Sequence, residues 1–270
     1  MRFDAQTIAE SVLASLDAGG QRAPFSTTYQ DLTNGDAYAV TAAVRKMRLA
    51  RGETPVGRKI GFTNRNIWPE YGVYEPIWGD MYDTTVHDVA AGDIARIMRL
   101  PEPRIEPEIV LGLDGDLRPG MSLPQIEAAI GWIAHGFEFV QSIYPGWRFK
   151  TADCIIDGGL HGAMFVGAKM NIPRHERGSL AARLANIRVT LSRNGDIQDR
   201  GVGANALDGP VNALMRLVEV LGRDSHNPPL KAGEMITTGT LTRAYPVVFG
   251  ERWSTTIEGV DLPGLSMEIA

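Results

Sequence analysis

The sequence of 270 residues predicts an α+β fold in which a mostly helical amino-terminal domain, residues 1–88, precedes a β-rich domain, residues 89–270. In the first 50 positions, apolar residues recur at the three- and four-residue spacing of amphipathic helices. After residue 88 the chain has short apolar runs separated by turns that contain glycine and proline, which is typical of strands. The two patterns do not alternate regularly, as they would in a protein built from βαβ units.

Two helices and a strand are predicted in the first region. Asp4 can cap a helix that ends at Gly19, where a glycine favours the left-handed conformation of a helix end. A second helix is expected from about residue 36 to residue 51, and Gly52 can terminate it. Residues 55–62 then predict a short strand.

The second region begins with a predicted strand over residues 104–113. Ser122 then starts a capping-box pattern, which indicates the beginning of a helix. We expect this helix to bury Ile130 and Ile133 and to end near Gly136, because these apolar positions follow helical spacing.

The rest of the second region is expected to contain strands and one further long helix. Residues 137–143 predict a second strand, and residues 210–221 predict a helix with Asp208 as its cap. The tail, residues 234–265, has the pattern of strands joined by turns.

Composition and charge exclude several classes of protein. The formal net charge is −5 and the basic residues are scattered, so a surface that follows nucleic-acid phosphates is not expected. Cys154 is the single cysteine, which excludes an intramolecular disulfide and argues against a cysteine-ligated metal. No apolar run has the length of a membrane span and no signal-peptide core follows the first residues, so we expect a cytoplasmic protein.

Two glutamates on the strand over residues 104–113 are candidate metal ligands. Residues two apart on a strand face the same side, so Glu106 and Glu108 are expected to project together. Pro107, between them, removes a ladder hydrogen bond and favours an edge or bulge. A Glu-x-Glu pair is also common on solvated strand faces, and this pair alone does not decide between the two interpretations.

A third acid favours the metal interpretation. Glu138 lies between aromatic and aliphatic neighbours, and a carboxylate in an apolar strand needs a partner. One hard divalent cation would satisfy all three carboxylates, and ligation by oxygen alone points to Mg²⁺ or Mn²⁺. Three protein ligands leave about three octahedral positions open, and a 2-oxo acid can fill two of them.

Several segments of the chain together resemble a known family. They are Gly35–Val40, Val56–Thr63, Gly79–Met81, Glu106–Glu108, Glu138 and Leu230–Thr240. In this order and spacing they resemble the 2-keto-4-pentenoate hydratase family, which includes the 4-oxalocrotonate decarboxylases and belongs to the fumarylacetoacetate hydrolase superfamily. The resemblance covers most of the chain.

The resemblance implies a β-rich catalytic domain with the fold of fumarylacetoacetate hydrolase, in which Glu106, Glu108 and Glu138 hold Mg²⁺ or Mn²⁺. It implies that Lys59 and Asp80 lie close to a bound substrate, and that the chain forms homo-oligomers. The implied activity is that of a lyase that adds water to a 2-hydroxy-2,4-dienoate of the 2-oxopent-4-enoate type. The product would be a 4-hydroxy-2-oxo acid in the catabolism of aromatic compounds.

Chemical roles can be assigned to the residues of this implied site. Lys59, as an ammonium, could bind the substrate carboxylate or a developing oxyanion, or it could transfer protons if it is desolvated. Asp80 is the candidate proton shuttle, and the competing interpretation is a turn aspartate beside glycine. Thr238, Gly239 and Thr240 could line the substrate with hydroxyl groups and backbone amides.

Some positions depart from the family pattern. Residues 141–143 read Gln-Ser-Ile where the family usually has Asp-Ser-Arg, and Asp157-Gly158 stands where an Asp-Asn pair is usual. His161 follows closely and is the most reactive residue without an assigned role; a lone histidine is more often structural, so it is left out of the predicted site. These departures leave the metal ligands intact and leave the exact substrate open.

Three alternatives compete with the hydratase. A metal-dependent decarboxylase of a 2-oxo-3-enedioate would need a cation for the second carboxylate, for which the candidates are Arg65, Arg148 and Arg243. A carbon–carbon hydrolase would need a His-Glu pair that activates water, but His175 and Glu176 are adjacent and their side chains are not expected to converge. A non-catalytic binding protein on the same fold would be favoured by the loss of a ligand, and none is lost.

Overall fold

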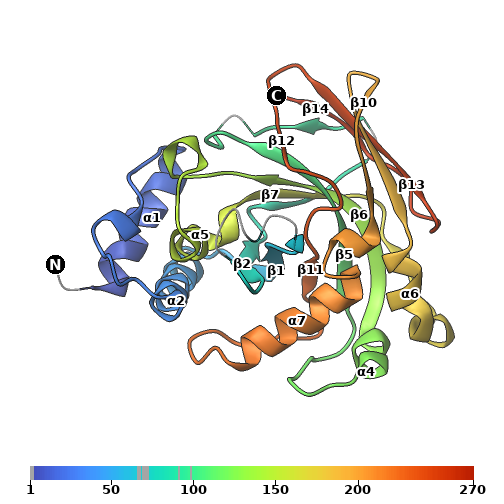
Figure 1. The fold of residues 1–270 in the computed structure, drawn as a ribbon, viewed down its shortest axis with the longest axis horizontal. Coiled ribbons are helices and arrows are strands. Elements are labelled where there is room, and N and C mark those ends of the chain that lie inside the picture. The colour runs from blue at the N-terminus through green and yellow to red at the C-terminus, as the bar shows by residue number, and fades with distance from the viewer. Residues whose placement is uncertain (1–2, 66–67, 69–72, 91, 98) are drawn as a thin grey trace.

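The computed structural model describes residues 3–65, 68, 73–90, 92–97 and 99–270. Two β-sheets form the centre of the protein, and helices pack around them in two groups (Figure 1). Helices α1, α2 and α5 lie together on one side, and α4, α6 and α7 gather around another part of the larger sheet. This arrangement confirms the predicted α+β class.

The helices have the following bounds: α1 Ala5–Ala18, α2 Asn34–Ala50, α4 Leu123–Ala128, α5 Thr151–Ile156, α6 Leu180–Ala185 and α7 Pro210–Gly222. The short 3₁₀ turns are η1 Phe25–Thr27, η3 Pro145–Trp147, η4 Gly158–Leu160, η5 Arg174–Ser179 and η6 Gly203–Asn205.

The strands have the following bounds: β1 Pro55–Gly61, β2 Ile77–Tyr82, β3 Val86–Asp88, β4 Ile94–Ala95, β5 Arg104–Leu113, β6 Ile130–Val140, β7 His161–Val166, β8 Met170–Asn171, β9 Arg188–Arg193, β10 Asp196–Val202, β11 Met235–Thr237, β12 Tyr245–Pro246, β13 Arg252–Glu258 and β14 Ser266–Ile269. The larger sheet has the order β2-β1-β11-β5-β6-β7-β3, with β12 paired to β5 and β8 paired to β6. The second sheet has the order β10-β9-β13-β14-β4.

The first two helices form where their capping residues predict them. The Asp4 side chain accepts a hydrogen bond at the start of α1, and Gly19 ends the helix with a φ of 61°. Helix α2 starts two residues earlier than expected because Thr33 and Asp36 form a capping box. Apolar residues of both helices pack with those of α5 in one cluster, which covers one end of the larger sheet (Figure 1).

Strands β1 and β2 link the amino-terminal helices to the rest of the protein. Both strands lie within residues 1–88, and both belong to the same sheet as β5, β6 and β7. Strand β1 runs parallel to β11, and it can approach closely because a Cβ at Gly57 would lie only 1.9 Å from the carbonyl oxygen of Met235. The division into two domains at residue 88 stays a prediction.

Two expectations from the sequence are wrong in detail. Helix α4 ends at Ala128, and Ile130 and Ile133 lie on strand β6 rather than on a longer helix. The isoleucine spacing fits either element, and long-range pairing of β6 with β5 decides for the strand. Helix α7 is preceded by Gly209 at φ 142°, without a side-chain cap, so Asp208 does not cap it.

The antiparallel pair of β5 and β6 positions the predicted carboxylates. Its register places Glu106 directly opposite Glu138 and Glu108 opposite Gly136. Facing side chains on neighbouring strands approach within a few ångströms, so three acids from two strands converge on one side of the sheet. No helix among the residues described is long and apolar enough to cross a membrane.

Candidate metal centre and active site

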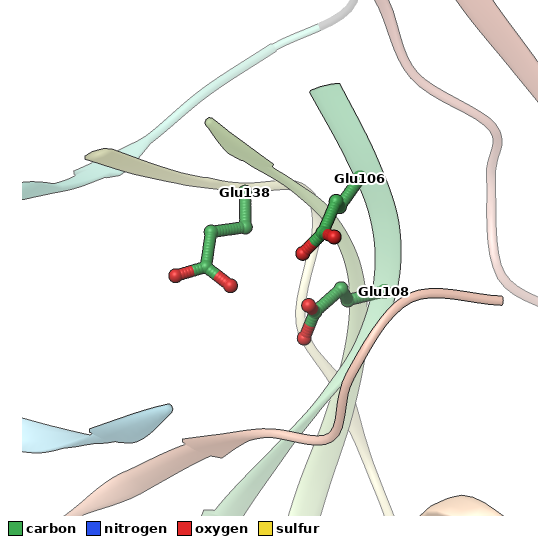
Figure 2. A group of neighbouring side chains, drawn as sticks. All are labelled: Glu106, Glu108 and Glu138. Carbon is green, nitrogen blue, oxygen red and sulfur yellow. The ribbon is translucent and has the colours of Figure 1, made fainter. Parts of the chain in front are cut away.

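Glu106, Glu108 and Glu138 form one cluster, as the sequence predicts. One carboxylate oxygen of each residue lies within 4.8 Å of the corresponding oxygens of the other two. Figure 2 shows the first two side chains leaving β5 and the third leaving β6, with the carboxyl groups directed into a shared space. Glu108 and Glu138 are fully buried, whereas Glu106 is partly exposed.

The donor set fits a hard divalent cation. Glu108 Oε2 accepts a hydrogen bond of 2.8 Å from the Gly239 amide, and Glu138 Oε1 lies 2.8 Å from His161 Nδ1. Of the other two oxygens, Glu108 Oε1 is buried without a hydrogen bond from any described residue, and Glu138 Oε2 is buried with the Lys59 ammonium 3.2 Å away. Unsatisfied buried carboxylate oxygens are costly unless a cation approaches them, and Mg²⁺ or Mn²⁺ prefers such oxygen ligands.

The electrostatics of the metal-free cluster are those of crowded acids. Burial raises the pKa of Glu106 to about 7, with a further increase from Glu138 and an opposing effect of Lys59. Burial and the two neighbouring carboxylates also raise the pKa of Glu108 well above its ordinary value. Burial would raise the pKa of Glu138 too, but the Lys59 ammonium and the His161 hydrogen bond together lower it.

Lys59, which the resemblance places near a bound substrate, lies beside the cluster. It is buried on β1, its Nζ donates a hydrogen bond of 2.9 Å to the Gly159 carbonyl, and it lies 3.2 Å from Glu138 Oε2. Burial alone would lower the pKa of Lys59, but Glu138, Glu106 and Glu108 outweigh that effect and raise it. The side chain is therefore an ammonium in this setting rather than a neutral base.

A pocket opens onto this group. Its wall contains Lys59, Glu106, Gly239 and Thr240, together with the aromatic and aliphatic side chains of Phe62, Ile77, Val140, Trp147, Phe149 and Leu160. Glu108 and Glu138 lie deeper, behind Glu106. A mostly apolar pocket with a few charged groups at one end is the usual form of a small-molecule site.

The predicted substrate-lining segment is only partly at the pocket. Gly239 and Thr240 line it, whereas the Thr238 hydroxyl donates to the Ile109 carbonyl and is buried away from it. Gly239 has a φ of +91°, and a Cβ there would lie 1.8 Å from the Thr63 hydroxyl oxygen. This position therefore requires glycine, and it brings the amide to Glu108.

The structure places Asp80 outside the carboxylate cluster. Its Oδ1 lies 2.6 Å from Arg45 and 2.9 Å from the buried Arg58, and the Tyr82 hydroxyl donates to its Oδ2. Asp80 faces Arg58 across the β1–β2 pair, one position away from Lys59, so the two side chains leave opposite faces. Asp80 lines a second cavity, which His161 also lines.

Sequence reasoning missed Arg104 as a pocket residue. Its guanidinium lies over the Trp147 ring, 4.0 Å from the centroid, and no carboxylate among the described residues forms an ion pair with it. Alternation along β5 could have found it, because Arg104 lies two residues before Glu106 on the same face.

Among the arginines predicted to bind a second carboxylate, Arg65 is paired with Asp208 at the surface.

The remaining arginine candidates and the His-Glu pair also lie away from the pocket. Arg148 and Arg243 are exposed and do not line it. His175 and Glu176 come within 3.7 Å of each other, which corrects the expectation that they do not converge. Both are exposed on η5 and neither lines the pocket, so this pair does not serve the site.

The raised pKa of Glu106 predicts that metal affinity depends on pH. A cation binds the ionised carboxylate, so a proton must leave when the pH is below about 7. Affinity for Mg²⁺ should rise from pH 6 toward pH 8, by up to about tenfold per unit for each proton displaced. Calorimetric titrations at these pH values measure the affinity, and repeating each in two buffers of different ionisation enthalpy measures the number of protons released. Equal affinity at pH 6 and pH 8 would contradict this account.

Comparison with known proteins gives the same class. No model of a protein family matches the chain. The chain is 31% identical to the 2-keto-4-pentenoate hydratase of Paraburkholderia xenovorans (strain LB400), over 93% of this chain and 90% of that protein. It superimposes with a TM-score of 0.90, at 25% identity, on the 4-oxalocrotonate decarboxylase from Pseudomonas putida G7 complexed with magnesium and adipate, covering 98% and 97% of the two chains.

A more distant likeness defines the fold. A protein from Yersinia pestis CO92 described as belonging to the fumarylacetoacetate hydrolase family superimposes with a TM-score of 0.54, at 17% identity, over 80% of this chain and 93% of that one. The fold of the β-rich part is therefore that of fumarylacetoacetate hydrolase. The chain belongs to the family of 2-keto-4-pentenoate hydratases and 4-oxalocrotonate decarboxylases.

Proposed function

We propose that the protein is a lyase that depends on Mg²⁺ or Mn²⁺ and adds water to a 2-hydroxy-2,4-dienoate of the 2-oxopent-4-enoate type, giving a 4-hydroxy-2-oxo acid. The observation that carries the proposal is the cluster of Glu106, Glu108 and Glu138 at the end of a mostly apolar pocket. We assign this reaction to the catabolism of aromatic compounds because the family resemblance implies it. The name of the Paraburkholderia xenovorans hydratase supports the hydration itself.

The three glutamates would hold the cation. When bound, it supplies a positive charge that stabilises the negative charge developing on the keto oxygen of the substrate. Glu106 lies at the pocket wall and the other two lie deeper. The cation would therefore lie between the buried carboxylates of Glu108 and Glu138 and the open pocket.

Lys59 and the 239–240 turn would bind the reacting end of the substrate. The Lys59 ammonium uses one donor for Gly159 and lies at the pocket wall, so it can also bind a substrate carboxylate or oxyanion. Thr240 lines the same pocket and adds a polar side chain to it. The aromatic wall would exclude bulk water from the diene, which strengthens these electrostatic contacts.

One observation favours a second candidate, a decarboxylase of a 2-oxo-3-enedioate. Arg104 lies two residues from Glu106 on the same strand face, roughly 7 Å along β5. A six-carbon substrate anchored by its 2-oxo acid end would place a second carboxylate within reach of that guanidinium. The likeness to a decarboxylase complexed with adipate supports the same alternative.

The two candidates give different products from different substrates. Purified protein with Mg²⁺ is incubated with 2-hydroxypenta-2,4-dienoate and, separately, with 2-oxohex-3-enedioate. The proposal expects ultraviolet absorbance of the dienol to disappear without release of carbon dioxide. Release of carbon dioxide from the enedioate, without consumption of the dienoate, would replace the hydratase by the decarboxylase.

For Asp80, the ion pairs favour a structural role over the proton shuttle suggested by the resemblance. Asp80→Asn would leave the buried Arg58 with Glu234 as its remaining ion-pair partner among the described residues. We expect a loss of roughly 3 kcal/mol in the free energy of unfolding, because a buried charge loses one of its two ion-pair partners. Turnover of the folded variant should fall by less than the roughly 10²-fold of a lost acid–base group. A larger loss with unchanged stability, measured by urea unfolding and steady-state kinetics, would restore the shuttle role.

We also propose that the chain forms a homo-oligomer, as the family resemblance implies. Sedimentation at micromolar concentration tests this proposal. A single species of 29.4 kDa would contradict it.

A further inference from the structure

His161 contacts one of the three glutamates and does not line the substrate pocket. It is buried at the start of β7, its Nδ1 lies 2.8 Å from Glu138 Oε1, and its Nε2 lies 2.9 Å from the Thr85 hydroxyl. His161 and Thr85 line the second cavity, and neither lines the substrate pocket. Direct contact with a substrate in that pocket is therefore not a role for His161.

The direction of the hydrogen bond follows from chemistry. An ionised carboxylate only accepts hydrogen bonds, so the hydrogen atom lies on His161 Nδ1 and is donated to Glu138. The Thr85 hydroxyl contacts the other ring nitrogen. The same hydroxyl accepts a hydrogen bond from the backbone amide of Tyr82, the last residue of β2, and this bond fixes the position of Thr85. The ring is thus fixed at both nitrogens before it contacts the glutamate.

The two fully buried glutamates of the cluster share one arrangement. In each, one carboxylate oxygen is held by a hydrogen-bond donor of the protein: the Gly239 amide binds Glu108, and His161 binds Glu138. The second oxygen of Glu108 has no hydrogen bond from a described residue, and the second oxygen of Glu138 has the Lys59 ammonium 3.2 Å away. Without such a partner a glutamate side chain can rotate about three bonds, and ordering it on metal binding costs free energy. Outer partners that orient metal ligands typically account for 10–100-fold in metal affinity.

We propose that His161 is a positioning residue that holds the Glu138 carboxylate in its metal-binding orientation through the hydrogen bond from Nδ1, with Thr85 fixing the ring. The proposal rests on the proposed metal centre. It assigns a role to the histidine for which the sequence predicted none. His161 closely follows Asp157-Gly158, where the chain departs from the family pattern.

The test is metal affinity measured without substrate, by calorimetric titration of Mn²⁺ into chelator-treated protein. His161→Ala should weaken binding about 10–100-fold with one site per chain retained. His161→Asn should recover most of the affinity, because its amide nitrogen can donate from nearly the place of Nδ1. Thr85→Val should weaken binding by a smaller factor. His87→Ala, at an exposed histidine two residues from Thr85, is the matched control and should bind as the wild type does.

A kinetic measurement separates positioning from a general loss of structure. For His161→Ala, the Mn²⁺ concentration that half-activates the enzyme should rise, while turnover at saturating Mn²⁺ changes much less. Wild-type affinity in His161→Ala would overturn the proposal, as would equal weakness of the alanine and asparagine variants. Failure of the wild type itself to bind Mn²⁺ would overturn the metal centre as well, so the two failures are distinguishable.

Discussion

Replacing Glu108 by glutamine is expected to abolish metal binding at micromolar Mg²⁺ or Mn²⁺ and, with it, turnover. Glutamine keeps the shape of the side chain but removes a negative charge from a fully buried ligand. The backbone N–H of Gly239 can donate only to the side-chain oxygen of the glutamine. The NH₂ group of the glutamine would then point at the other carboxylates. We expect at least a 100-fold loss of affinity, measured by calorimetry.

Stability provides an internal control for this variant. The metal-free wild type contains three crowded acids, so removing one of them relieves repulsion and should not destabilise the metal-free protein. Thermal unfolding in chelator should therefore occur at an equal or higher temperature in Glu108→Gln, whereas added Mn²⁺ should stabilise the wild type alone. Tight Mn²⁺ binding by the folded variant would remove Glu108 from the ligand set.

The second large effect is expected for Lys59→Met, which removes the ammonium while keeping a linear side chain. If Lys59 binds the substrate carboxylate or a developing oxyanion, turnover should fall by about 10²–10³-fold and substrate binding should weaken. Metal binding should not weaken. The ammonium lies 3.2 Å from Glu138, so its loss removes a positive charge that repels the cation.

The Lys59 variant is informative because turnover is expected to fall while metal affinity is not. A purely structural lysine would lose stability and metal binding together, with turnover falling only in proportion to the metal-bound fraction. Steady-state kinetics at saturating Mn²⁺ and calorimetry on the same sample distinguish the two cases. Turnover within a few-fold of the wild type at saturating metal would show that Lys59 does not act on the substrate.

The metal cluster could be predicted from sequence because it depends on short-range geometry. Alternation on one strand places Glu106 and Glu108 together, and an acid in an apolar strand needs a partner, which points to Glu138. The sequence could not predict that Glu106 on β5 lies directly opposite Glu138 on β6, because the register of two strands is decided by pairing over many residues. The same pairing turned the expected helix at Ile130 into a strand.

Residues that act through their neighbours were harder to predict. Whether Asp80 serves the substrate or a buried arginine depends on which face of β2 it occupies, and that is set by its pairing with Arg58 on β1. The contact of His161 with Glu138 joins two strands and a loop residue, Thr85, that lies 76 positions away in sequence. No local pattern encodes such a contact, whereas Arg104 was accessible from simple alternation along β5.

The most direct test of the proposed function is turnover of 2-hydroxypenta-2,4-dienoate as Mg²⁺ is added back to chelator-treated protein. The proposed function predicts no turnover without metal. It predicts activation that follows the occupancy of one site per chain measured by calorimetry, with formation of the 4-hydroxy-2-oxo acid and no carbon dioxide. Full turnover in the presence of excess chelator, or no hydration at any Mg²⁺ or Mn²⁺ concentration that fills the site, would contradict it.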